Sequence, residues 1–220
     1  GAVKWSVHTP GFRHANGETA RKYLPATVSG GLAVFDYDGD GKLDLFFANG
    51  GELPSGRKTS VGHQNKLLRN LGSMKFEDVT ERADLQGSGY DFGAAVGDYD
   101  GDTRPDLLVA GLRSITLYKN RGDGTFQDVT AKAQLDNKGR WSVAAAWIDI
   151  DADTDLDLFV VNYVKWEPAG ERECLVNGKP DFCHPRFYEP TPNALFRNNG
   201  DGTFTDISET SAIGTKKGKG

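Results

Sequence analysis

One aspartate-rich pattern, D-x-D-x-D-x-x-x-D, occurs three times in this 220-residue sequence, beginning at Asp36, Asp98 and Asp149. Each copy follows a short run rich in small and apolar residues and precedes an apolar run such as Leu-Asp-Leu-Phe-Phe. A motif that recurs after tens of residues indicates an array of one supersecondary unit. The repetition therefore constrains the fold strongly, because every copy has to fold in the same way.

A second motif follows each aspartate cluster. It reads Leu-x-(Arg/Lys)-Asn and then Phe-x-Asp-(Val/Ile)-(Thr/Ser), and its copies are residues 67–80, 117–130 and 195–208. The next cluster begins 22 or 23 residues after the Phe of this motif, whereas the distance from a cluster to its own Phe varies from 28 to 55 residues. Each unit is thus expected to be a rigid module interrupted by a surface loop of variable length, and such loops often carry function.

The local pattern of each unit is that of short β-strands. One strand is expected before the cluster, a second after it, a third before a Gly-containing turn, and a fourth through the Phe-x-Asp segment. In the second and third units the turn is Asn-x-Gly-Asp-Gly, which is a strong hairpin signal. Four strands in a unit of this size are typical of a propeller blade. We therefore predict an all-β fold made of three four-stranded β-propeller blades.

The expected domain boundaries follow from these units. An N-terminal segment covers 1–29, the blades cover 30–82, 90–132 and 141–210, and 211–220 is a flexible tail or a truncated link to a next blade. The third blade includes a long Cys-containing loop at 163–193. Residues 3–7 are expected to lend an outer strand to the last blade and so to help close the ring.

The aspartate clusters are predicted to bind calcium. Carboxylates brought to one point in a tight loop repel each other unless a cation lies among them, and Ca²⁺ accepts six to eight oxygen ligands in a flexible shell. Each loop would supply four carboxylates and the backbone carbonyl of its seventh residue. The predicted ligands are Asp36, Asp38, Asp40, Lys42 and Asp44; Asp98, Asp100, Asp102, Arg104 and Asp106; and Asp149, Asp151, Asp153, Asp155 and Asp157.

The clusters have two other possible interpretations. An EF-hand needs a bidentate Glu at the twelfth loop position, where this chain has Phe47, Val109 and Val160. Metal-free solvated turns are the other interpretation, and three copies in the same register argue against it. The loops are unequal, because the sixth residue is Gly41 in the first but Thr103 and Thr154 in the others. Since Gly best tolerates a positive φ, the second and third loops are predicted to bind more weakly than the first or with altered geometry.

Several segments resemble known families. Residues 90–102 resemble the FG-GAP repeats of integrin α-subunit propellers and the related VCBS repeats. Segments 12–17, 22–25 and 30–41, together with the Cys-containing insertion of the third unit, resemble the cartilage acidic protein/ASPIC-UnbV family. That resemblance implies a secreted or periplasmic seven-bladed propeller that binds calcium and is usually not catalytic. Ala26, where an acidic residue is expected, departs from the pattern.

Composition bounds the partners. The formal charge of −5 argues against a nucleic-acid binder, and three bound divalent ions would change it to +1. No apolar run is long enough for a transmembrane helix. Three blades are too few for a closed ring, so further blades are expected from the same chain or from others. The two cysteines, Cys174 and Cys183, are predicted to form a disulfide rather than remain unrelated buried thiols, which implies an oxidising compartment.

No catalytic residues are predicted. The four histidines, His8, His14, His63 and His184, lack zinc-site spacing, and no nucleophile–base motif is present. The tripeptide 121–123, Arg-Gly-Asp, is interpreted as part of a hairpin turn. The four tryptophans, Trp5, Trp141, Trp147 and Trp166, are interpreted as core or inter-blade packing rather than ligand platforms, and Trp166 is singled out as the exception because it lies on the long loop.

We expect a calcium-binding extracytoplasmic scaffold that binds a protein or a glycan through the loops between the second and third strands, above all through 163–193. A packed lid is the alternative for this loop. The alternative functions are an accessory subunit of a larger membrane or redox assembly, and a polysaccharide-acting enzyme.

Overall fold

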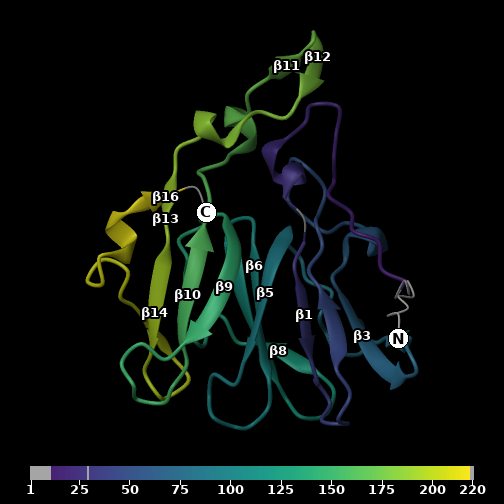
Figure 1. Cartoon of the computed structure of the whole chain (residues 1–220), viewed down its shortest axis with the longest axis vertical. Helices are drawn as coiled ribbons and strands as arrows, with labels where there is room; N and C mark the ends of the chain where they lie inside the picture. The colour runs from purple at the N-terminus through teal and green to yellow at the C-terminus, as the bar shows by residue number, and fades with distance from the viewer. Residues whose placement is uncertain (1–10, 29, 219–220) are drawn as a thin grey trace, which may run out of the picture.

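The computed structural model describes residues 11–28 and 30–218, and these form an all-β molecule (Figure 1). Three antiparallel sheets of four strands follow one another along the chain and lie side by side. The first contains β1 (Leu32–Phe35), β2 (Asp44–Phe47), β3 (Lys66–Gly72) and β4 (Lys75–Asp78). The second contains β5 (Asp91–Gly97), β6 (Asp106–Gly111), β7 (Ser114–Asn120) and β8 (Phe126–Asp128). The third contains β9 (Ser142–Ile148), β10 (Asp157–Asn162), β14 (Ala194–Asn198) and β15 (Phe204–Asp206).

Every sheet has the same strand order, in which each strand pairs with the one before it. The prediction of an all-β chain built from repeated units is confirmed. No sheet closes on itself among the described residues, and the three sheets stack as separate layers. The N-terminal strand expected at 3–7 lies outside the described residues.

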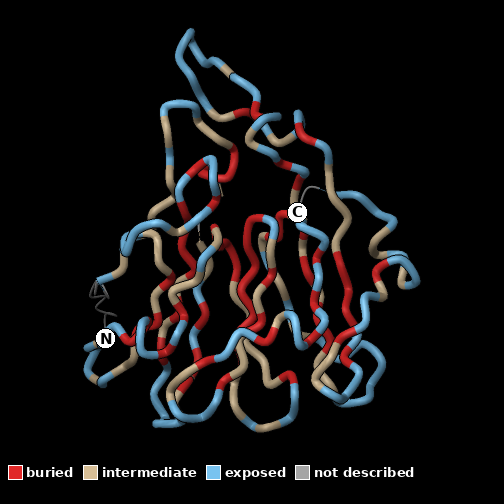
Figure 2. Tube along the Cα trace, turned by 180° about the vertical axis from the view of Figure 1, so that it is seen from behind, coloured by how far each residue is buried: buried red, intermediate tan, exposed pale blue. Residues whose placement is uncertain are grey.

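Two apolar cores hold the sheets together. Between the first and second sheets, side chains such as Phe35, Phe46 and Leu107 are buried in one cluster. Between the second and third sheets, Leu117 and Leu158 belong to the corresponding cluster. Because side chains alternate along a strand, each sheet can offer one face to each neighbour. Figure 2 shows this layout as buried segments along the strands and exposed segments in the loops at both ends.

A third core lies at the end of the sheets where the long loop projects. It joins the N-terminal 3₁₀ turn η1 (Leu24–Thr27) to the loop 163–193, with Leu24, Trp141 and Trp166 among its members. Short elements lie within or near this loop: η3 (Pro168–Gly170), β11 (Cys174–Val176), β12 (Lys179–Asp181), η4 (Pro185–Phe187) and β13 (Thr191–Pro192). The N-terminal segment and the third unit are therefore tied together although they are far apart in sequence.

The remaining elements are short. One further 3₁₀ turn, η2 (Val61–His63), precedes β3. Within the segment expected as a tail or truncated link, 211–220, the described residues include η5 (Ile213–Thr215) and β16 (Lys217–Gly218), and β16 pairs with β13. None of the helices in the described ranges has the length and apolar character needed to cross a bilayer.

Candidate metal loops and recognition surface

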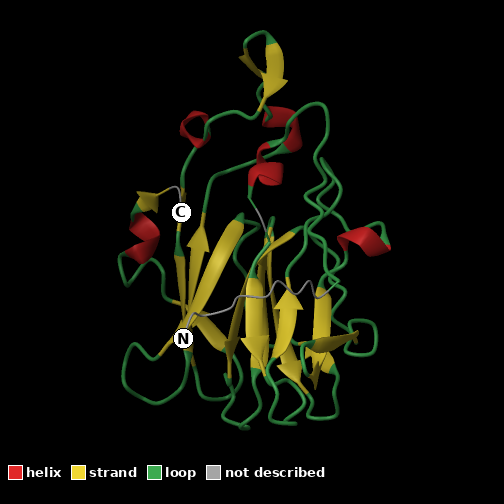
Figure 3. Cartoon of the chain, turned by 45° about the vertical axis from the view of Figure 1, so that its right-hand side comes forward, coloured by secondary structure: helices red, strands yellow, loops and turns green. Residues whose placement is uncertain are grey.

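The three aspartate loops lie at the same end of the three sheets, opposite the projecting hairpin β11–β12 (Figures 1 and 3). Each loop connects the first strand of a sheet to the second. Its first aspartate organises the bend: the Asp36 carboxylate accepts hydrogen bonds from the backbone N–H of Gly39 at 2.8 Å and Gly41 at 2.8 Å. Asp98 and Asp149 accept from the corresponding loop backbone. The first aspartate therefore shapes the turn.

The ninth aspartate of each loop is a buried clamp. Asp44 accepts from Tyr37 N at 3.0 Å and from Asn70 N at 2.7 Å, so it ties the loop to the third strand. Asp106 and Asp157 make the equivalent pairs of bonds. Burial raises the pKa of Asp106 to about 7, and its two backbone bonds oppose that rise. The last aspartate of the motif thus has a structural role in addition to its predicted role as a ligand.

Three carboxylates gather in each loop. Their oxygens lie within 4.8 Å of one another, in the groups Asp36, Asp38 and Asp40; Asp98, Asp100 and Asp106; and Asp149, Asp151 and Asp157. Calcium–oxygen distances of about 2.3–2.6 Å place ligands of one ion up to about 5 Å apart, so these all-oxygen groups fit a hard cation. The predicted ligands Asp44, Asp102 and Asp153 are not in the groups. The carbonyl ligands of Lys42, Arg104 and Asp155 stay a prediction.

The sixth residue of each loop has a left-handed backbone. Its φ is +81° at Gly41, +69° at Thr103 and +78° at Thr154. A β-branched residue is rare in this region and costs of order 1–3 kcal/mol there, whereas Gly adopts it freely. The first loop therefore differs from the other two in backbone strain, because its sixth residue is Gly and theirs is Thr.

Basic side chains contact the first two clusters. Arg69 Nε lies 2.6 Å from Asp38 Oδ2, and Lys119 Nζ lies 2.9 Å from Asp102 Oδ2 and also pairs with Asp100. In the third loop, no ion pair to any aspartate is formed within the described ranges. There, desolvation and the charges of Asp153 and Asp157 raise the pKa of Asp151. The third cluster is therefore the one whose charge the protein leaves unbalanced.

Comparisons with known proteins agree with the repeat. A family model described as an FG-GAP-like repeat matches residues 36–109 and 98–160, each match running from one aspartate loop through the next. The chain belongs to the FG-GAP-like repeat family. No curated protein matches this FG-GAP-like chain in sequence.

Among solved structures, the FG-GAP-like chain is similar to a lectin from Agrocybe aegerita, whose description is specific recognition of non-reducing terminal N-acetylglucosamine. The identity is 16% and the TM-score 0.38, with 79% of this chain and 36% of the lectin covered. The chain thus spans about a third of the length of that protein.

The long loop of this FG-GAP-like chain is anchored by one buried carboxylate. Glu171 accepts from Leu24 N at 3.1 Å, and also from Trp166 Nε1 and Tyr188 OH. Trp166, which the sequence singles out among the tryptophans, packs like a core residue, because its ring is buried in the third core. The base of the loop therefore packs as a lid, and no sequence motif predicted that Glu171 would organise it.

The tip of the same loop is different. The predicted disulfide between Cys174 and Cys183 is present and closes the hairpin β11–β12 at its base, with Cα atoms 5.3 Å apart. Beyond it, the apolar side chains of Leu175 and Val176 are exposed, and Phe187 on η4 is partly exposed. The loop 163–193 thus combines a packed base with an exposed apolar tip.

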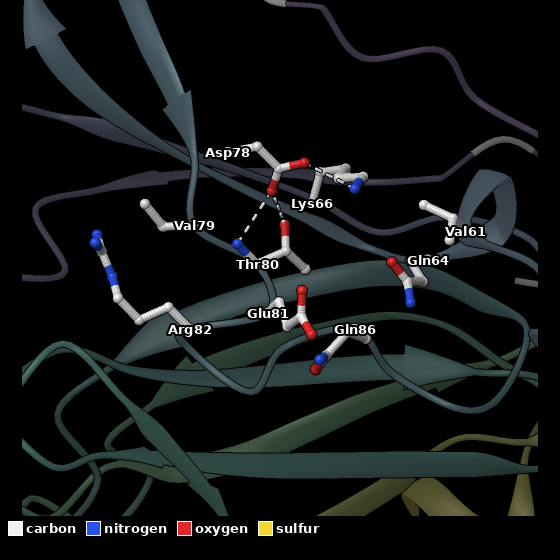
Figure 4. A pocket seen from close by; sticks show the side chains of 9 residues that line it. All are labelled: Val61, Gln64, Lys66, Asp78, Val79, Thr80, Glu81, Arg82 and Gln86. Carbon is white, nitrogen blue, oxygen red and sulfur yellow. Dashed lines mark hydrogen bonds and ion pairs between the residues drawn. The ribbon is translucent and has the colours of Figure 1, made fainter.

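Sequence reasoning missed a groove of about 740 Å³ beside the first sheet (Figure 4). The Lys66–Asp78 ion pair, at 2.8 Å, lies in this groove, and Thr80 donates to the same carboxylate at 2.5 Å. Its other lining residues are Val61, Gln64, Val79, Glu81, Arg82 and Gln86. Because they come from η2, β3 and the turn after β4, no single motif in the sequence could have revealed them.

The other sequence candidates have local structural contacts. Asp123 accepts from Thr125 N at 3.0 Å, which fits the interpretation of 121–123 as a hairpin. His14 Nε2 accepts from Gly30 N at 3.0 Å, and His184 Nδ1 accepts from Arg186 N at 3.1 Å. His63 Nδ1 lies 3.0 Å from Ser60 Oγ. His8 and Trp5 lie outside the described residues.

Proposed function

We propose that this chain is a calcium-binding, extracytoplasmic scaffold whose three sheets are blades of a β-propeller. The observation that carries the proposal is the occurrence of three all-carboxylate groups, one per sheet, at the same end of the molecule. Calcium is favoured over zinc because the donors are oxygens, without the imidazole or thiolate ligands typical of structural zinc. The proposed role is binding and not catalysis, with up to three ions.

The metal would fasten each loop in its bent form. Aspartates at the first, third, and fifth or ninth positions would hold the ion, and the ninth aspartate would connect it to the third strand through its backbone bonds. A bound cation would offset the repulsion among these carboxylates. The chemistry supplied by calcium here is structural, because the loops lie at the opposite end of the sheets from the long loop.

The proposed recognition surface is the tip of 163–193. Its exposed apolar side chains on a disulfide-closed hairpin are typical of a protein-binding site, so a protein is the favoured partner and a glycan the alternative. The disulfide supports a secreted or periplasmic location. We also propose that the chain is close to the ASPIC-UnbV family. The motifs at 12–17 and 30–41 and the Cys-containing insertion support this.

Thermal unfolding tests the calcium proposal. We expect excess Ca²⁺ to raise the Tm and EDTA to lower it, because an ion bound only by the folded state contributes about 2.7 kcal/mol per site at 100 Kd. Equal concentrations of Mg²⁺ should have a smaller effect, since Mg²⁺ dehydrates reluctantly.

A matched pair of variants localises the effect. Asp98→Asn should reduce the Ca²⁺-dependent shift by about one third, whereas Asp123→Asn, which changes a hairpin aspartate outside the clusters, should leave it intact. Identical melting curves in Ca²⁺ and EDTA would overturn the proposal.

A further inference from the structure

Two arginines share one aromatic ring on the long loop. The guanidinium carbon of Arg186 lies 4.8 Å from the centroid of the Phe187 ring, and that of Arg172 lies 5.8 Å from it. Arg172 precedes the hairpin β11–β12 and Arg186 follows it, so the fold brings them together from the two arms of the loop. We call these three residues the Arg–Phe–Arg cluster.

The packed base of the loop fixes the backbone of this cluster. Arg172 directly follows Glu171, and Phe187 directly precedes Tyr188. Glu171 and Tyr188 are buried, and the Tyr188 OH donates to the Glu171 carboxylate. The disulfide of the loop joins the same two arms a second time. The two arms are therefore held together before a partner arrives, which lowers the cost of ordering the surface on binding.

The charge of the cluster is not balanced within the described chain. Both arginines are exposed, and neither forms an ion pair with a described residue. Two other carboxylates of the loop are paired elsewhere, Glu167 with Arg113 at 2.7 Å and Glu189 with Lys217 at 3.7 Å. Two like charges beside one ring repel each other, and an anionic group between them would offset that repulsion. The cluster is therefore suited to an anionic group from another molecule.

The side chains of the cluster favour carboxylates of a protein over a neutral sugar. A guanidinium group that stacks on a ring keeps N–H groups at its edge, and their planar fork matches a carboxylate. Two such forks side by side fit a segment with more than one carboxylate. The Phe187 ring is 42% exposed, but the guanidinium groups that lie over it leave less of its face for a sugar ring.

Apolar side chains extend the same surface. Leu175 and Val176 on β11 are 58% and 54% exposed, and Val176 pairs in register with the exposed Lys179 on β12. The hairpin projects beyond the ends of the three sheets (Figures 1 and 3). All of these residues belong to one loop, so their arrangement does not depend on which sheet lies beside another. A partner that covers them needs apolar side chains next to its carboxylates.

We propose that the Arg–Phe–Arg cluster and the hairpin tip bind an acidic segment of a protein partner, in which Asp or Glu residues lie beside apolar ones. The carboxylates would contact Arg172 and Arg186, and the apolar side chains would cover Leu175 and Val176. The inference rests on the proposed role of this loop as the recognition surface and specifies the chemistry of its partner. It is independent of the bound calcium.

Selection from a library of random short peptides, with the 220-residue chain as bait, tests the proposal. The enriched peptides should carry Asp or Glu beside apolar residues. A synthetic peptide of an enriched sequence is then titrated by fluorescence anisotropy. Arg172→Gln/Arg186→Gln should weaken its binding at least about tenfold, because both charge-assisted contacts are lost. Added salt should weaken binding to the parent chain as well.

Three further variants separate the cluster from the overall charge. Arg121→Gln/Arg197→Gln removes the same charge from two exposed arginines outside the loop and should leave the affinity unchanged. Arg172→Lys/Arg186→Lys keeps the charge but not the planar fork, so its affinity should lie between those of the parent and the Gln variant. Glu173→Gln, which removes the exposed carboxylate next to Arg172, should tighten binding.

Several outcomes would overturn the inference. These are enriched peptides without an excess of acidic residues, equal affinity of the parent chain and the Gln double variant, and binding of polygalacturonate or heparin in place of any peptide. If apolar peptides are enriched and Leu175→Asn abolishes their binding, the recognition surface stands and only the acidic partner is wrong. A library that yields no peptide removes both. None of these results alters the calcium-dependent Tm shift, which tests the scaffold proposal separately.

Discussion

The first and third aspartate loops have the same sequence pattern but balance their charge differently. In the first, Arg69 and Lys42 lie against the carboxylates of Asp38 and Asp40, and Gly41 occupies the left-handed position without strain. In the third, no basic side chain of the described residues pairs with an aspartate of the loop, and Thr154 occupies the left-handed position. The second loop combines basic neighbours with a strained Thr.

This difference separates two requirements that the motif alone does not distinguish. The shape of the loop is enforced by backbone bonds to its first and ninth aspartates in all three copies, and the pair of bonds to the ninth aspartate is equivalent in each. In the first two copies, basic side chains neutralise part of the charge of the aspartate cluster. In the third copy, no basic side chain of the described residues does so. The third loop is therefore expected to depend most on a bound metal ion, although the backbone favours the first loop.

The largest expected effect comes from removing the buried clamp. Asp157→Ala leaves the backbone N–H groups of Ile150 and Asn198 without their acceptor. Because the Asn198 bond is buried and the Ile150 bond only part-buried, the loss should cost about 1–3 kcal/mol. Asp44→Ala should cost a similar amount in EDTA, because it breaks the same pair of bonds. Denaturant unfolding measures both.

Calcium should then distinguish these two variants. Asp157 belongs to its carboxylate group and Asp44 does not, so the cost of Asp157→Ala should grow when Ca²⁺ is added and the cost of Asp44→Ala should not. An equal calcium-dependent increase for both would show that the loops bind alike and would remove the distinction.

A smaller effect is expected from exchanging the sixth residue. Thr154→Gly should stabilise the chain by about 1 kcal/mol or more in EDTA, since it relieves a β-branched residue at φ +78°. Gly41→Thr should destabilise it by a similar amount. Calorimetry of both variants provides the check, and a loss of stability in Thr154→Gly would mean that the entropy of Gly in the unfolded chain outweighs the strain.

Much of this organisation could be predicted from the sequence. The repeated clusters, the Phe-x-Asp motif and the hairpin turns predicted four-stranded units, and the disulfide of the long loop was predicted from two cysteines in a Pro-rich segment. These features are local, because a few neighbouring residues determine each turn or strand. The sixth-position Thr was also visible in the sequence, and the structure places it at a positive φ, while the ranking of the loops by calcium affinity stays a prediction.

Other features depend on contacts between distant segments. Glu171 meets Leu24 across 147 positions, and Arg69 meets Asp38 only because β3 folds back beside the first loop. The burial of Trp166 on the long loop likewise follows from this packing. Charge balance and lid packing therefore could not be predicted, since both depend on which strands lie beside which loops.

The smallest expected effect is a change in Tm on Asp→Asn substitution that differs in direction between the third and the first loop. In EDTA, Asp151→Asn should raise the Tm slightly, by about a degree, because it removes one of several unpaired like charges. Asp38→Asn should lower the Tm or leave it unchanged, because it breaks the pair with Arg69, and exposed pairs of this kind contribute little. The Asp151→Asn effect should fade at high salt, where exposed charges are screened. If both substitutions stabilised the chain equally, Arg69 would not neutralise the first cluster. The two loops would then differ only in the backbone strain of their sixth residues, Gly41 and Thr154.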